Sequence, residues 1–128
     1  MGGSIMTAKA LELYATQMFI DGYPNGRQAN YRYMLLEEEK EIEYFNQKIT
    51  VPCYGVEIIR EDLDQDDIYS IEKNSIEYMT TYKYKVVQLI KKLYDNCVSP
   101  LHLIDIAGSL ADEWVCDFDE ILNDIQAQ

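Results

Sequence analysis

Cys97, His102 and Asp105 are the residues of this chain whose types and spacing come nearest to a reactive site. His102 is the only histidine, Asp105 lies within reach of it on one helix face, and Cys97 lies shortly upstream. A thiolate beside an imidazole in an exposed cleft would be a nucleophile with its base. Because His102 falls in the first turn of an expected helix, where the helix dipole disfavours an imidazolium, we expect a surface or capping histidine.

The acidic string Asp62–Asp66 is a second candidate, because it imitates the first positions of an EF-hand calcium loop. The rest of the pattern fails. Asp67 stands where the loop needs glycine, and Lys73 stands where it needs the bidentate glutamate. We therefore expect a solvated polar connection over residues 61–67 and no metal site.

Other motifs that carry chemistry do not occur in the sequence. It has no serine nucleophile elbow, no phosphate-binding glycine loop and no zinc-ligand spacing. We therefore expect no catalytic residue and no cofactor. The three cysteines are widely spaced, which is typical of reduced thiols in a cytoplasmic protein. No stretch approaches the roughly 18–20 apolar residues that span a bilayer, so we expect no membrane partner.

Charge is the more informative feature of the sequence. Asp and Glu number 23 against 11 Lys and Arg, and the formal net charge is −12. This balance excludes a uniformly basic nucleic-acid binder. Lysines gather in residues 82–94, whereas residues 105–124 carry carboxylates and no Lys or Arg. Acidic surfaces orient encounters with basic partners. We expect a protein partner to dock on five of the carboxylates: Asp112, Glu113, Asp117, Asp119 and Glu120.

The N-terminal part is predicted to be a helix from Thr7 to Ile20. Its apolar residues recur at helical spacing, and a cluster of turn residues at 21–26 ends the pattern. Met1–Ser4 has the composition of a cloning remnant. We therefore divide the chain into 1–28, with remnant, helix and linker, and a single α+β domain over 29–128. The helix is a second docking candidate, through a partner groove or a homodimer.

The middle of the chain is predicted to form three or four short strands in an antiparallel meander. The alternating segments are 31–37, 49–60, 68–72 and 76–80, with a turn at 73–75 between the last two. The charge run at 37–43 is predicted to be a hairpin end or a short edge strand. Gly55 lies inside a strand, where glycine marks a bulge or a close backbone approach.

The pattern then changes to a helical period in three segments, at 82–94, after Ser99–Pro100 and from 117 onward. Thr81 is the expected N-cap of the first helix and Asn96 its left-handed stop. Gly108 costs a helix about 1 kcal/mol relative to alanine, which indicates tight packing or a kink there. The sequence thus predicts an α+β fold. A small antiparallel sheet would carry the C-terminal helices on one face, could stay polar on the other, and would be joined by the N-terminal helix.

Four segments carry a resemblance to a known family. They are Leu89–Leu93, Val98–Asp105, Tyr31–Glu38 and Tyr54–Ile58. Over about residues 31–114 the chain resembles a domain-of-unknown-function family of small uncharacterised clostridial (Firmicutes) proteins. The resemblance implies a cytoplasmic bacterial protein with no assigned activity, and it transfers no catalytic residue.

Three functions are compatible with these features. We expect a non-enzymatic cytoplasmic bacterial protein that binds another protein, a basic one, through the acidic surface. The first alternative is a nucleic-acid mimic that inhibits a basic DNA-binding protein or nuclease. The second is a small-ligand binder or enzyme that uses Cys97, His102 and Asp105.

Overall fold

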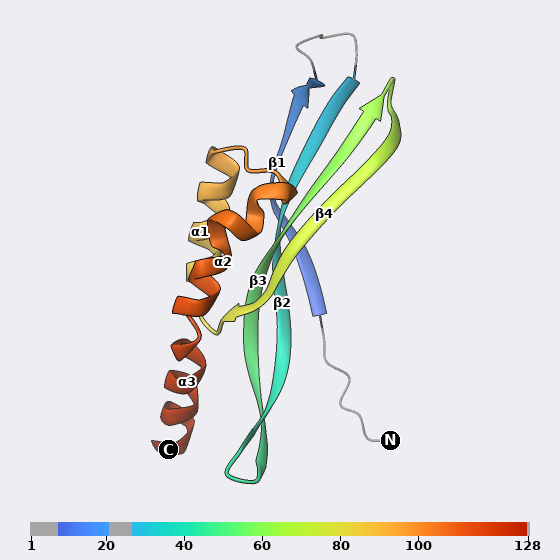
Figure 1. The fold of residues 1–128 in the computed structure, drawn as a ribbon. Helices are drawn as coiled ribbons and strands as arrows, with labels where there is room; N and C mark the ends of the chain where they lie inside the picture. The colour runs from blue at the N-terminus through green and yellow to red at the C-terminus, as the bar shows by residue number, and fades with distance from the viewer. Residues whose placement is uncertain (1–7, 21–26, 128) are drawn as a thin grey trace, which may run out of the picture.

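A computed structural model describes residues 8–20 and 27–127 of the chain. Four strands form one antiparallel sheet in the order β1-β2-β3-β4, and three helices and a 3-10 turn follow (Figure 1). The strands are β1 (Ala8–Phe19), β2 (Arg27–Tyr44), β3 (Gln47–Asp64) and β4 (Asp67–Thr80). The helical elements are α1 (Lys83–Asp95), η2 (Pro100–His102), α2 (Leu103–Glu113) and α3 (Cys116–Ala127). An α+β fold with C-terminal helices on an antiparallel sheet is therefore confirmed.

The predicted N-terminal helix is wrong, because residues 8–19 form strand β1. Tyr14, Thr16 and Met18 are partly buried, while the residues between them are exposed. This is the period of a strand. The spacing of the apolar residues in this segment is compatible with either a helix or a strand. Antiparallel pairing with the long strand β2 favours the strand. The homodimer predicted through a helix therefore loses the element that would form it. Residues 1–7, with the proposed cloning remnant, and the turn cluster 21–26 lie outside the described residues.

Two tight hairpin turns join the three long strands. Phe45 and Asn46 turn between β2 and β3 with φ angles of 49° and 62°. Gln65 and Asp66 turn between β3 and β4 with φ angles of 52° and 73°. Paired positive φ angles match the twist of antiparallel strands, and Asn and Asp tolerate them.

The bounds of the strands confirm one prediction about the middle of the chain and correct two others. The charge run at 37–43 is the hairpin end of the long strand β2, as expected, because the turn at Phe45–Asn46 follows it directly. The expected connection at 61–67 is instead the end of β3, the hairpin turn and the start of β4. The turn expected at 73–75 lies inside β4. The backbone at Asn74 continues as part of the strand, and the polar side chain has another role. It donates a hydrogen bond to the Pro100 carbonyl at 3.3 Å and so ties β4 to η2.

Gly55 lies where β3 and β4 approach closely, which confirms the prediction for this glycine. The pairing register shifts between Tyr54 and Val56. A Cβ atom on Gly55 would stand 2.2 Å from the backbone oxygen of Ile76, well inside contact distance. Only glycine therefore fits this position without moving strand β4.

The core lies between the sheet and the helices, all of which lie on one side of the twisted sheet in Figure 1. Alternate residues of β2 and β3 point into it, and α1 and α2 contribute helical stripes. Its fully or almost fully buried members include Tyr33, Leu35, Val56, Ile58, Met79, Val86, Ile90, Leu93, Leu103 and Ala107. The Tyr33 hydroxyl donates to the Val98 carbonyl at 2.9 Å, and burial raises the pKa of this tyrosine.

The helix ends differ from the predictions in their detail. Tyr82, and not Thr81, precedes α1, and its backbone N–H donates to the Thr80 hydroxyl at 3.0 Å. Asn96 has an ordinary φ of −102°, whereas Cys97 takes the left-handed conformation with φ 50°.

Gly108 corrects one prediction about α2. A Cβ there would meet only the Ile104 side chain, at 3.4 Å, so the predicted tight packing is absent at this described position.

No helix in the described part of the chain has the length and apolar character that crossing a bilayer requires.

Candidate functional site

Four of the five predicted docking residues are exposed around the junction between α2 and α3. Asp112 and Glu113 end α2, and Asp119 and Glu120 lie in the first turns of α3. Val115, in the short connection, is 61% exposed. We use the name acidic junction for the four exposed carboxylates and Val115, that is, for Asp112, Glu113, Val115, Asp119 and Glu120. It combines carboxylates with an exposed apolar side chain.

The carboxylates of the acidic junction have few partners within the protein. Within residues 8–20 and 27–127, Asp112, Glu113 and Asp119 form no ion pair. Glu120 accepts a hydrogen bond from the Tyr82 hydroxyl, and burial together with this carboxylate raises the pKa of Tyr82. Three negative charges at this junction thus have no counter-ion in the part of the chain that the structure describes.

Asp117, the fifth predicted residue, is buried at 3% exposure and is not part of the exposed surface. Its carboxylate accepts bonds from the Lys85 ammonium at 2.8 and 2.9 Å and from the Thr80 hydroxyl at 2.6 Å. Its backbone oxygen accepts a bond from the Thr81 hydroxyl at 3.4 Å. Asp117 therefore fastens the first turn of α3 to β4 and α1, which sequence spacing did not reveal.

Three of the four lysines of α1 pair with carboxylates within the protein. Hydrogen bonds to Asp117 raise the pKa of Lys85, whose ammonium lies 5.7 Å from the centre of the Trp114 ring. Lys83 binds Glu37 at 2.8 Å, and Lys91 binds Asp95 at 2.6 Å. Only the Lys85–Asp117 pair joins α1 to the acidic stretch at 105–124, since Lys83 pairs with β2 and Lys91 pairs within α1, so most of the predicted segregation of charge remains.

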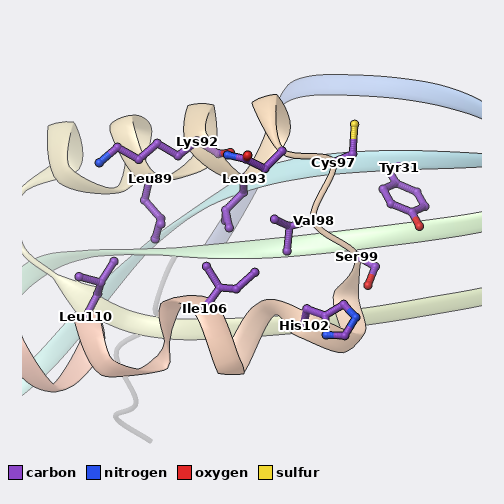
Figure 2. Close-up of a pocket in the computed structure, with 11 residues that line it drawn as sticks. Tyr31, Leu89, Lys92, Leu93, Cys97, Val98, Ser99, His102, Ile106 and Leu110 are labelled. Carbon is purple, nitrogen blue, oxygen red and sulfur yellow. The ribbon is translucent and has the colours of Figure 1, made fainter.

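A second candidate site is a pocket of about 730 Å³ between α1 and α2 (Figure 2). Small-molecule sites in proteins have volumes of about 300–1,000 Å³ and are mostly apolar. The apolar lining consists of Tyr31, Leu89, Leu93, Val98, Ile106 and Leu110. The polar and thiol-bearing lining consists of Lys92, Asn96, Cys97, Ser99 and His102.

The pocket brings together two residues of the predicted reactive set and leaves out the third. Cys97 and His102 both line it and both are exposed, whereas Asp105 is exposed outside the lining. Figure 2 shows the Cys97 thiol pointing away from the His102 ring. A nucleophile and its base need hydrogen-bond reach, so this arrangement supports binding rather than thiol chemistry.

The EF-hand-like string is divided between a strand and a turn. Asp62 is buried in β3 and accepts a bond from the Arg60 guanidinium at 2.8 Å, and Asp66 lies in the hairpin turn. Among the described residues, no group of three or more His, Cys, Asp or Glu side chains is placed to hold a metal ion.

Sequence reasoning missed the pocket because its walls have the pattern of an ordinary core. Leu89 and Leu93 share one face of α1, and Ile106 and Leu110 share one face of α2. Both spacings predict burial against a neighbour. The incomplete closure between the two helices leaves room between these stripes and depends on their packing against the sheet.

Comparison with known proteins places most of the chain in a family. A family model described as "Family of unknown function (DUF6514)" matches residues 23–113. No curated protein matches the chain, and no solved structure does. The matched region holds the whole pocket lining, whereas β1 and α3, with two carboxylates of the acidic junction, lie outside it.

Proposed function

We propose, from the premise that the chain belongs to the family of unknown function DUF6514, that it is a non-enzymatic protein that binds a partner protein. The docking site is the acidic junction, and the partner presents a basic segment. We further propose a cytoplasmic, bacterial protein of clostridial origin. This rests on the resemblance of residues 31–114 to such proteins.

The observation that carries the proposal is an exposed apolar side chain among unpaired carboxylates. Val115 stands 61% exposed between Glu113 and Asp119, which have no ion-pair partner in the part of the chain that the structure describes. An apolar centre with a polar rim is the usual anatomy of a protein interface. A net charge of −12 also accelerates the encounter with a basic surface.

The same observation favours protein docking over nucleic-acid mimicry. A mimic needs carboxylates spaced over a continuous face, and the burial of Asp117 interrupts the acidic run. A phosphate backbone also offers nothing that corresponds to the exposed Val115 side chain. The mimic is retained as an outcome of the test.

The test is affinity purification from cells that make the protein, with quantitative mass spectrometry of what is recovered. The variant Asp112→Lys/Glu113→Lys alters the junction. The variant Asp64→Lys/Asp67→Lys makes the same change of charge at two exposed carboxylates beside the β3–β4 turn. A basic protein that the wild type and the control retain and the junction variant loses supports the proposal.

Two results would overturn it. One is equal recovery of every protein by the two variants, which would mean that only total charge matters. The other is a partner that duplex DNA displaces and that binds with a steep dependence on salt, which would favour the mimic.

A further inference from the structure

We propose that the pocket between α1 and α2 binds a small apolar molecule that carries one carboxylate, with Lys92 as the counter-ion. This site is separate from the acidic junction and does not depend on the function proposed for it. Two features support this site: the shape and lining of the pocket, and Lys92, the one α1 lysine that has no carboxylate partner among the described residues.

The walls of the pocket offer apolar surface from two sides. Leu89 and Leu93 project from α1, and Ile106 and Leu110 project from α2 into the same space (Figure 2). Ile106 is 50% exposed although it lies in this concave site. Leu89 and Leu93 are themselves buried in the core, at 6% and 1% exposure. The apolar surface that a ligand would remove from water is therefore mainly that of Ile106 and the half-buried Leu110, and such removal is the main source of affinity in pockets of this kind.

Lys92 supplies positive charge at the edge of this apolar space. The other three lysines of α1, namely Lys83, Lys85 and Lys91, each bind a carboxylate. Lys92 has no such partner within the described residues, although the protein carries a net charge of −12. In Figure 2 its amine extends toward the Leu110 end of the pocket, and His102 lies at the other end.

One cation and an apolar lining define the ligand class. A single ammonium balances one negative charge, whereas a phosphate dianion is usually held by several donors or by arginines. The remaining polar groups of the lining, on Asn96, Ser99 and His102, can orient a ligand by hydrogen bonds. Aliphatic and aromatic carboxylates both have this chemistry.

The test is an NMR titration of the full ¹⁵N-labelled chain with decanoate, with 2-naphthoate and with decanol as the neutral analogue. We expect saturable binding of at least one carboxylate, with shifts at the amides of Val98 and Ile106. Lys92→Gln should weaken the carboxylate about fivefold and leave decanol unchanged. Lys91→Gln is the matched control, because it removes the same charge from the neighbouring position, outside the lining.

Blocking the pocket separates it from the rest of the surface. Ile106→Glu places a carboxylate at a half-exposed wall position and should abolish binding of both acids. The relative affinities of decanoate and 2-naphthoate decide between a chain and a ring as the apolar part. The proposal fails if neither acid binds saturably at concentrations up to about 1 mM, or if Lys92→Gln and Lys91→Gln weaken binding equally. Neither failure bears on the acidic junction.

Discussion

Replacing Asp117 by alanine should destabilise the protein by about 2–3 kcal/mol. The carboxylate is buried and accepts hydrogen bonds from Lys85 and from Thr80. Its loss leaves a cation and a fully buried hydroxyl without their acceptor. The first helical turn of α3 would then lose its main polar attachment to β4 and α1.

The magnitude follows from how far the remaining partners can regain water. Breaking a buried ion pair by removing one member costs about 3–5 kcal/mol. The Lys85 side chain is 24% exposed, so its ammonium can recover part of its hydration, which reduces this cost. The buried Thr80 hydroxyl still accepts a bond from the Tyr82 N–H, but its own O–H is left without an acceptor, and an unsatisfied buried donor costs about 1–3 kcal/mol. The expected total is therefore near the lower limit for a buried pair.

Urea unfolding followed by circular dichroism measures this change. The midpoint should fall by about 1–2 M urea with an unchanged slope. Asp119→Ala is the matched control in the same helix, because Asp119 is exposed, and it should change stability by less than about 0.5 kcal/mol. Equal stability of the two variants would refute the assignment of Asp117 to the fold. In that refuting case, a double-mutant cycle that combines Asp117→Ala with Lys85→Met should also show no coupling energy between the two residues.

Two further predictions concern glycines and thiols. Gly55→Ala should destabilise the protein by about 1–3 kcal/mol, because the added methyl meets strand backbone at 2.2 Å, whereas Gly108→Ala should stabilise α2 by up to about 1 kcal/mol. Thermal unfolding checks the pair, and the opposite order of stabilities would contradict the packing. Iodoacetamide at pH 8 should modify Cys97 and Cys116 in the native protein and Cys53 only in urea. Burial raises the pKa of Cys53 to about 11, so its reactive thiolate forms only as the pH approaches that value. Intact-mass spectrometry counts the adducts, and a third adduct formed as fast in the native protein would contradict the burial.

The parts of the fold that were predicted correctly are those with a local signal. The apolar stripe at Val86, Leu89, Ile90 and Leu93 marks α1, and the alternation at Tyr31, Tyr33 and Leu35 marks the buried face of β2. Gly55 indicated a close approach of two strand backbones, because only a residue without a Cβ permits such an approach. Each signal depends on neighbours within a few residues.

The errors occur where two local structures were almost equally favourable. The apolar residues of 8–19 fit a helix or a strand, and pairing with β2 decided for the strand. Asn74 and Asp66 both suit turns, but the register between β3 and β4 selected Gln65–Asp66. In both cases the deciding contacts come from another strand.

The amino-acid sequence by itself determined an α+β fold, a strongly acidic protein and the approximate limits of the three helices. Only the tertiary structure decided which charges are exposed and where space remains. Asp117 and Thr80 are far apart in the chain, yet their side chains meet at 2.6 Å and remove one carboxylate from the surface. The pocket beside Lys92 likewise exists only because α1 and α2 rest on the sheet without closing on each other. Helical and strand periods are set by near neighbours, whereas burial and ion pairing depend on which distant residues the whole fold brings together.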